Sequence, residues 1–257
     1  MHATNFDLSA YFRRIGYTGS ATANATTLQA LMRRQLFSVP FENLDVQAGK
    51  IVSMVPENIT NKLLRSRRGG YCYEVNGLFA MALAALGISY RFVAARPMFY
   101  PVRRPRTHMA LVAEVEGRHW LCDLGFGSYG IRAPMDLDVL DTEVAQDSDT
   151  FRLSRDAFGN YLLQAKVEGE WANQYGFDLS PQEWIDFVPA NYLNSTHPDA
   201  IFVQKLLVVL HQPDGRLILL GDMFKTVMNG RVEKRQLTEE ELVQVLENRF
   251  GLPARST

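Results

Sequence analysis

The hydrophobic pattern changes its period at Gly87, and this change restricts the fold more than any other feature of the chain. Before Gly87, apolar residues recur at spacings of three and four, which is typical of helices buried on one face. From Ile88 to Ala94, and in short runs up to Phe177, the period is two, which indicates strands. Helices followed by short strands predict an α+β protein whose strands form a barrel or a curled sheet.

The C-terminal part of the chain mixes both kinds of pattern. Residues 181–188 are expected to form a short helix and residues 191–202 a polar loop. A final helix is expected after Thr238, because an acidic first turn and a buried apolar stripe follow this residue. The strands expected between these segments are residues 203–210, 216–220 and 223–228.

The composition indicates a globular protein with a sizeable core. Of the 257 residues, 47% are hydrophobic and 21% are charged, enough for one large domain or two to three small ones. The net charge of -1 does not indicate a protein that binds nucleic acid through an overall positive charge. No basic segment followed by an apolar stretch opens the chain, and no apolar run is long enough to span a bilayer. We therefore expect a cytoplasmic protein without a membrane partner.

Cys72 and Cys122 are too few for a disulfide framework or a zinc site, and we expect no metal. Cys72 precedes an apolar pattern that runs to Gly87, so it is expected to open a helix. The first-turn amides, the helix dipole and the nearby Arg67 and Arg68 all stabilise an anion there, which favours a nucleophilic thiolate. Cys122 is expected in the core. The alternative for Cys72 is likewise a small apolar residue packed in a core helix.

A predicted β-hairpin brings a histidine and an aspartate together. One strand begins at His108 and the other ends at Asp123, with Val115 opposite Arg118 across a two-residue turn. This register places His108 and Asp123 on one face, diagonal to each other and about 7 Å apart at Cβ. Asp123 could then orient the imidazole as a base for a thiol. Taken singly, His108 could be a sheet histidine and Asp123 a cap for the glycines that follow it.

Two further segments carry charged residues with more than one interpretation. In the expected connector 39–44, Glu42 could pair with Arg68 and Asn43 could bond exposed backbone, which would brace the cysteine loop. A solvent-facing Glu42 is the alternative. The acidic stretch 133–149 lacks the spacing of a metal site and is expected to be a solvated loop.

Four motifs carry a resemblance to a known family. They are Val39–Leu44, Arg68–Gly77, Pro105–His108 and Asp123–Gly127. In sequence, order and spacing they resemble the arylamine N-acetyltransferases, and the similarity runs to about Leu252. The resemblance implies a helical bundle with the cysteine in residues 1–87, a β-barrel with the histidine and aspartate in residues 88–188, and an α/β lid in residues 189–257. It also implies a catalytic core similar to that of papain-type cysteine proteases and transglutaminases.

The resemblance also implies a reaction and a catalytic triad. Carried over to this chain, Cys72 is the nucleophile, His108 is the general base and Asp123 orients the imidazole. The family transfers an acetyl group from acetyl-CoA to the cysteine and then, after CoA leaves, to an aromatic amine or hydrazine. A thioester intermediate is activated enough for a weakly basic amine to attack it. Acetyl-CoA is thus the expected acyl donor, and a small arylamine or hydrazine is the expected acceptor.

Binding residues follow from the same resemblance. Phe41 and Phe126 match positions that line the acceptor pocket, where aromatic walls would hold an aryl ring. Thr107 and Gly127 are candidates for contacts with the pantetheine arm of the donor. The residues predict no particular oligomeric state.

Other functions are compatible with the same three catalytic residues. The chain ends sooner after Leu252 than many acetyl-CoA-using members do. Shorter relatives include natural-product amide synthases, which join an acyl chain from an acyl carrier protein to an aromatic amine. A cysteine hydrolase would use water in place of the amine. A non-catalytic binding protein is a further alternative, but the intact set of Cys72, His108 and Asp123 argues against it.

Overall fold

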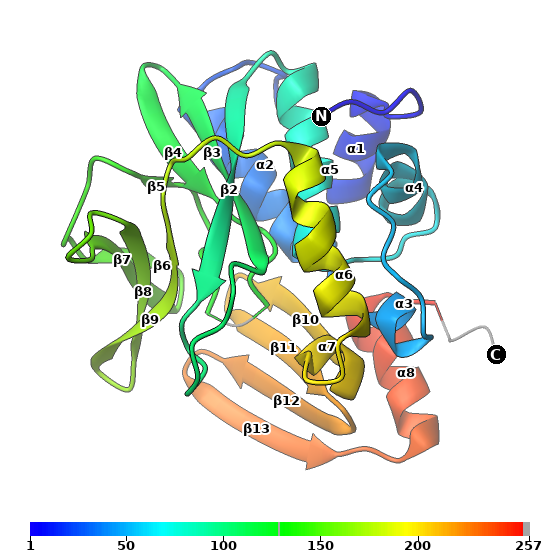
Figure 1. The fold of residues 1–257 in the computed structure, drawn as a ribbon. Helices are drawn as coiled ribbons and strands as arrows, with labels where there is room; N and C mark the ends of the chain where they lie inside the picture. Colours follow the sequence, from blue (N-terminus) through cyan, green and yellow to red (C-terminus); the bar gives the residue numbers. More distant parts are fainter. Residues whose placement is uncertain (128, 254–257) are drawn as a thin grey trace.

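The computed structural model describes residues 1–127 and 129–253, and it shows an α+β protein (Figure 1). Helices gather in the N-terminal part, a curled sheet occupies the middle of the chain, and a second sheet with a long helix follows. The predicted fold class is therefore confirmed. Residues 254–257, at the end of the expected lid, lie outside the described residues. Within the described ranges, no helix combines the length and hydropathy that crossing a bilayer requires.

Helix α5, which begins at Cys72, lies in the core of the helical part. All its residues from Cys72 to Leu83 are buried, so it is packed on every side and not only on the predicted face. Small residues permit this packing: a Cβ on Gly77 would come within 3.0 Å of the ring of Trp184. The helices of this part are α1 (Leu8–Ile15), α2 (Ala25–Ser38), α3 (Leu44–Gln47), α4 (Pro56–Thr60) and α5 (Cys72–Ala85), with a π-helical turn at Asn61–Arg65.

The middle of the chain forms an eight-stranded antiparallel sheet with the order β5-β4-β3-β2-β9-β8-β7-β6. Strands β2 and β3 pack against α5, so the sheet and the helices share one hydrophobic core. Val115 pairs with Arg118, which confirms the predicted hairpin register. The strands are β2 (Ser89–Pro97), β3 (His108–Val115), β4 (Arg118–Cys122), β5 (Met135–Asp136), β6 (Val144–Gln146), β7 (Asp149–Arg155), β8 (Tyr161–Val167) and β9 (Glu170–Phe177).

The second sheet has the order β1-β10-β11-β12-β13, and β1 comes from the expected connector 39–44. Leu217 and Leu219 of β11 pack with Leu246 of α8 on one face. Ile218, between them, points to the other face and lines a cavity. The elements are β1 (Phe41–Glu42), a 3₁₀ helix (Trp184–Phe187), α6 (Val188–Thr196), α7 (Ile201–Gln204), β10 (Leu207–Gln212), β11 (Gly215–Leu220), β12 (Met223–Met228), β13 (Arg231–Gln236) and α8 (Glu239–Phe250).

The C-terminal part differs from its predicted elements at four places. The helix expected at 181–188 begins only at Trp184, as a 3₁₀ helix that leads into α6. The prediction of a polar loop at 191–202 is wrong, because α6 and α7 occupy most of this segment. Strand β10 starts at Leu207 and not at Val203, which belongs to α7. The sequence pattern does not predict β13, because every residue of this strand is exposed and no apolar face marks it.

The acidic stretch 133–149 is only in part the expected solvated loop: most of its acids are exposed, but its two ends are structured. It contains β5 and β6, and its last two acids pair with arginines. Asp147 Oδ2 lies 2.9 Å from Arg33 Nη1, and Asp149 Oδ2 lies 2.6 Å from Arg132 Nη2. Arg132 is fully buried, so its guanidinium needs a carboxylate partner inside the protein.

Candidate active site

Cys72 occupies the first position of α5 and is only 3% exposed. The loop after β4 lies directly against it. A Cβ on Gly125 would come 2.5 Å from the Cα of Cys72, so only glycine allows this close approach. The contact brings the end of β4 next to the start of the helix that carries the cysteine.

His108 and Asp123 are in direct contact. Nε2 of His108 lies 2.7 Å from Oδ2 of Asp123, and the two residues are 4% and 1% exposed. His108 begins β3 and Asp123 follows the last residue of β4, so the hairpin register sets both side chains on one face. The amide of Gly125 donates to Oδ1 of Asp123 at 2.9 Å, which fixes the other carboxylate oxygen.

The charge of His108 follows from its neighbours. Burial by itself lowers the pKa of the imidazole. The charge of Asp123, the hydrogen bond with it, and the hydrogen bond and charge of Cys72 outweigh burial and raise the pKa to about 10. His108 is therefore an imidazolium at neutral pH, in contact with a carboxylate and with the cysteine sulfur. A cation next to a thiol favours its ionised, nucleophilic form.

We expect the contribution of His108 to stability to depend on pH. Its pKa in the folded protein, about 10, lies above the ordinary value of 6.5. The contribution is therefore complete below about pH 6.5 and is lost as pH rises through about 10. Denaturant unfolding of the wild type and of His108→Gln should show a difference in unfolding free energy that shrinks across this window. A difference that stays constant would contradict the imidazolium assignment.

Asn76 links the cysteine helix to the hairpin, although the predicted site does not include it. It lies one turn after Cys72 on α5 and is fully buried. Its Nδ2 donates to the carbonyl of Met109 at 2.7 Å and to Oδ1 of Asp123 at 3.2 Å. Its Oδ1 accepts from the amide of Leu124 at 2.9 Å. An amide side chain on a mostly apolar helix, four positions after the cysteine, is the signal that could have identified it.

A cavity of about 410 Å³ opens beside Cys72. The residues predicted for the site that line it are Phe41, Cys72, Thr107, His108, Phe126 and Gly127. Asp123 does not line it and reaches it only through His108. The ring of Phe126 lies edge-on to that of His108, with centroids 5.1 Å apart, and Tyr175 packs against both. No group of histidine, cysteine or acidic side chains that could hold a metal ion occurs among the described residues.

Part of the cavity wall is basic, which the sequence pattern does not reveal. Its charged residues besides His108 are Arg104, Asp199, Arg216 and Lys225. Nη1 of Arg216 is paired with Oδ2 of Asp149 at 2.8 Å. Burial and the nearby charges of Lys234 and Arg216 lower the pKa of Lys225. Sheet topology explains the assembly of this wall, because β11 and β12 present Arg216 and Lys225 to the same cavity.

Known proteins resemble this chain over nearly its whole length. A family model described as N-acetyltransferase matches residues 24–256. The chain is 36% identical over 250 residues to the arylamine N-acetyltransferase of Escherichia coli K12, covering 95% of this chain and 88% of that protein. It is 30% identical over 276 residues to human arylamine N-acetyltransferase 1, covering 96% and 94% of the two chains.

Solved structures share the fold. The arylamine N-acetyltransferase from Salmonella typhimurium superimposes with a TM-score of 0.91 at 32% identity, covering 98% of this chain and 92% of that chain. The Mycobacterium marinum arylamine N-acetyltransferase in complex with CoA superimposes with a TM-score of 0.90 at 32% identity, covering 96% and 93%. The chain therefore belongs to the arylamine N-acetyltransferase family, as its four motifs predict.

Proposed function

We propose that this chain acetylates arylamines and hydrazines with acetyl-CoA, in a ping-pong reaction through an acetyl thioester on Cys72. The observation that carries the proposal is the buried 2.7 Å contact of Asp123 with His108, which lines the same cavity as Cys72. A nucleophile, a base and a group that orients the base are what covalent catalysis needs. Membership of the family supports acetyl transfer, and a related structure contains CoA.

In the first step the Cys72 thiolate attacks the carbonyl carbon of the acetyl thioester. Negative charge moves to the carbonyl oxygen, and the backbone amide of Cys72, at the start of α5, is our candidate donor to it. The carbon–sulfur bond to CoA then breaks, and the His108 imidazolium gives its proton to the departing sulfur. The acetyl group remains on Cys72, and the imidazole is neutral.

Acetylation of Cys72 prepares His108 for the second step. The hydrogen bond and charge of Cys72 help to raise the pKa of His108. Both are lost when the sulfur is acylated, so the pKa falls. The neutral imidazole can then take a proton from the attacking amine as the tetrahedral intermediate collapses. The amide or hydrazide leaves, and the thiolate and imidazolium are restored.

We assign the aryl ring of the acceptor to the part of the cavity between Phe41 and Phe126. A Cβ on Gly127 would come 3.1 Å from the ring of Phe41, so glycine keeps the loop clear of this wall. The carbonyl of Thr107 already accepts a hydrogen bond from the Tyr73 hydroxyl at 2.8 Å. A contact of Thr107 with the pantetheine arm would therefore use its side chain.

We expect Lys225 to help bind the acyl donor, because the basic wall fits the phosphates of CoA. Lys225→Met should raise KM for acetyl-CoA by about 3- to 10-fold, equivalent to about 0.6–1.4 kcal/mol. KM for S-acetyl-N-acetylcysteamine, a thioester without phosphates, should not change. Steady-state kinetics with the two donors measures both values.

A second lysine provides the control for Lys225. Lys166 on β8 pairs with Glu143 and does not line the cavity. Lys166→Met should leave both KM values unchanged. An equal rise in both KM values for Lys225→Met would show that this lysine shapes the cavity and does not bind phosphate.

The direct test of the proposed function is the intact mass of the protein after mixing with acetyl-CoA, and again after adding an arylamine. One acetyl adduct on Cys72 that disappears as the N-acetylated amine forms would support it. An adduct released as acetate in the presence of the amine would indicate a hydrolase. No adduct, with Cys72 still alkylated by iodoacetamide, would favour another donor, such as the carrier-bound acyl chain of the amide synthases.

A further inference from the structure

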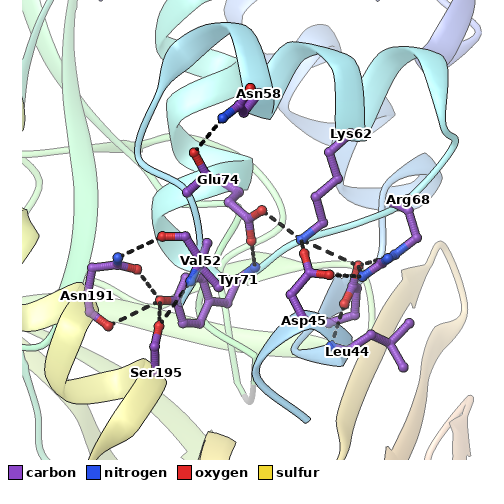
Figure 2. Close-up of polar contacts among 12 residues, drawn as sticks. Leu44, Asp45, Val52, Asn58, Lys62, Arg68, Tyr71, Glu74, Asn191 and Ser195 are labelled. Carbon is purple, nitrogen blue, oxygen red and sulfur yellow. Dashed lines mark hydrogen bonds and ion pairs between the residues drawn. The ribbon is translucent and has the colours of Figure 1, made fainter. Parts of the chain in front are cut away.

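An ionic cluster that the proposed chemistry does not use lies beside the backbone just before Cys72 (Figure 2). Its members are the buried Glu42 and Glu74 and the partly buried Asp45, Lys62 and Arg68. Glu74, at 2% exposure, is the member of this cluster that binds Tyr71, the residue directly before Cys72. Its Oε2 accepts a hydrogen bond from the backbone amide of Tyr71 at 3.1 Å. Its Oε1 pairs with Nζ of Lys62 at 2.7 Å. One carboxylate therefore connects the residue that precedes Cys72 to a fixed cation.

The rest of the cluster would hold Lys62 in place even without Glu74. Lys62 Nζ also lies 2.6 Å from Oδ2 of Asp45 and 3.9 Å from Oε1 of Glu42. The same Oε1 of Glu42 accepts a hydrogen bond from Arg68 Nε at 2.8 Å and lies 2.8 Å from Arg68 Nη2. These contacts pair Glu42 with Arg68 as the sequence suggests, and they leave Lys62 partnered if the Glu74 carboxylate is replaced.

We propose that Glu74 is a positioning residue for the nucleophile: by accepting the Tyr71 amide, it fixes the entry of the chain into α5 and so the place of Cys72. Glu74 does not line the cavity, so it acts through the backbone and not on substrate. The inference rests on the proposed function only in taking Cys72 as the reacting group.

The backbone of residues 70–71, directly before Cys72, packs closely against the Glu74 side chain. A Cβ on Gly70 would come 2.5 Å from Oε2 of Glu74, so the loop lies against the carboxylate itself. The other end of Tyr71 is also fixed, because its hydroxyl bonds to the side chain of Asn191 and lies 3.0 Å from Oγ of Ser195. Tyr71 is thus held at its amide and at its hydroxyl (Figure 2). The next residue in the sequence is Cys72.

The reach of the Glu74 side chain matters more in this arrangement than its charge. Burial raises the pKa of Glu74 to about 7, with Lys62 opposing the rise and Glu42 adding to it. Both the charged and the neutral carboxyl keep an oxygen that can accept the Tyr71 amide. A glutamine offers the same acceptor at the same distance, whereas an aspartate keeps the charge and loses the reach.

Three substitutions at this position separate reach from charge. Iodoacetamide should alkylate Cys72 of the Glu74→Gln variant at a rate within about threefold of the wild-type rate, because the side-chain oxygen that accepts the Tyr71 amide is kept. In Glu74→Asp and Glu74→Leu, Cys72 should be alkylated about 10- to 100-fold more slowly, because neither side chain can accept the Tyr71 amide. In single-turnover acetylation the same two variants should lose rate at saturating acetyl-CoA, while its KM stays within about twofold.

Asp45→Asn is the matched control, because Asp45 contacts the same lysine but not the amide of Tyr71. Cys72 of this variant should be alkylated at the wild-type rate. Peptide mass mapping locates the label on Cys72, and melting curves show whether each variant is folded at the assay temperature. If Glu74→Asp does not fold, Glu74→Leu still tests the loss of the acceptor.

Two results would overturn the proposal. A slow Glu74→Gln beside a normal Glu74→Asp would show that charge and not reach is required. Normal rates in all folded variants would make the role of Glu74 purely structural. Alkylation needs no acyl donor, so a wild-type protein that alkylates normally but accepts no acetyl group would refute the proposed function and leave this test intact.

Discussion

Cys72→Ser should lose acetyl transfer by a factor of about 10⁴ or more in single-turnover experiments. A serine hydroxyl is a far weaker nucleophile than a thiol that has an imidazolium beside it and lies at a helix N-terminus. The exchange replaces the sulfur by an oxygen in a side chain of similar size, at a position that is 3% exposed, so the fold should be kept. Chromatography of the N-acetylated arylamine measures the loss.

The second cysteine serves as the control for this experiment. Cys122 lies at the end of β4 and is fully buried, and burial raises the pKa of its thiol. Cys122→Ala should keep acetyl transfer and lose about 1 kcal/mol of stability through the lost core contacts. Turnover that survives in Cys72→Ser, with an unchanged melting curve, would remove Cys72 from the role of nucleophile.

The parts of the site that depend on local sequence are predictable. Helix α5 starts at Cys72 because apolar spacing, the preceding glycines and the first-turn acid all mark the same residue. The hairpin register follows from a two-residue turn, since a slip by one residue would move His108 to the opposite face. Two short-range rules therefore place a cysteine on a helix start, and an imidazole and a carboxylate on one strand face.

Buried polar residues explain why α6 is missed. Asn191, Asn194 and Ser195 make this segment look like a solvated loop, yet all three are buried. Nδ2 of Asn194 donates to the carbonyl of Thr107 at 3.1 Å, and Oγ of Ser195 accepts from the amide of Val52 at 3.3 Å. These partners lie far earlier in the chain, so no local pattern shows that the polar groups are satisfied inside the protein.

The basic wall of the cavity is missed for the same reason. Asp149 looks like one member of a solvated acidic run, but it is shared by Arg132 and Arg216 from two other segments. His211 lies close to both arginines, and burial together with their charges lowers its pKa to about 3, so it stays neutral. The carboxylate therefore balances a buried pair of arginines, one of which, Arg216, faces the cavity beside Cys72.

Asp123→Asn should lower the rate of acetyl transfer by about 10³- to 10⁴-fold and keep the fold. The amide can retain an oxygen toward Asn76 and Gly125, which contact Oδ1 in the wild type. Its nitrogen then replaces Oδ2 beside Nε2 of His108, and the negative charge that most strongly raises the pKa of His108 is gone. The pKa of His108 falls, so the imidazole is mostly neutral at pH 7 and no longer stabilises the thiolate.

The alkylation of Cys72 separates this loss of charge from a loss of structure. In Asp123→Asn the rate near neutral pH should fall, so that the pH profile differs from the wild-type profile, because the sulfur loses its cationic neighbour when the pKa of His108 falls. Asp136, a buried aspartate of the same sheet that pairs with Arg118, gives the control. Asp136→Asn should leave the profile where it is. If Asp123→Asn acetylates at the wild-type rate, Asp123 does not set the charge of His108, and the imidazole must be oriented by packing against Phe126 and Tyr175 alone.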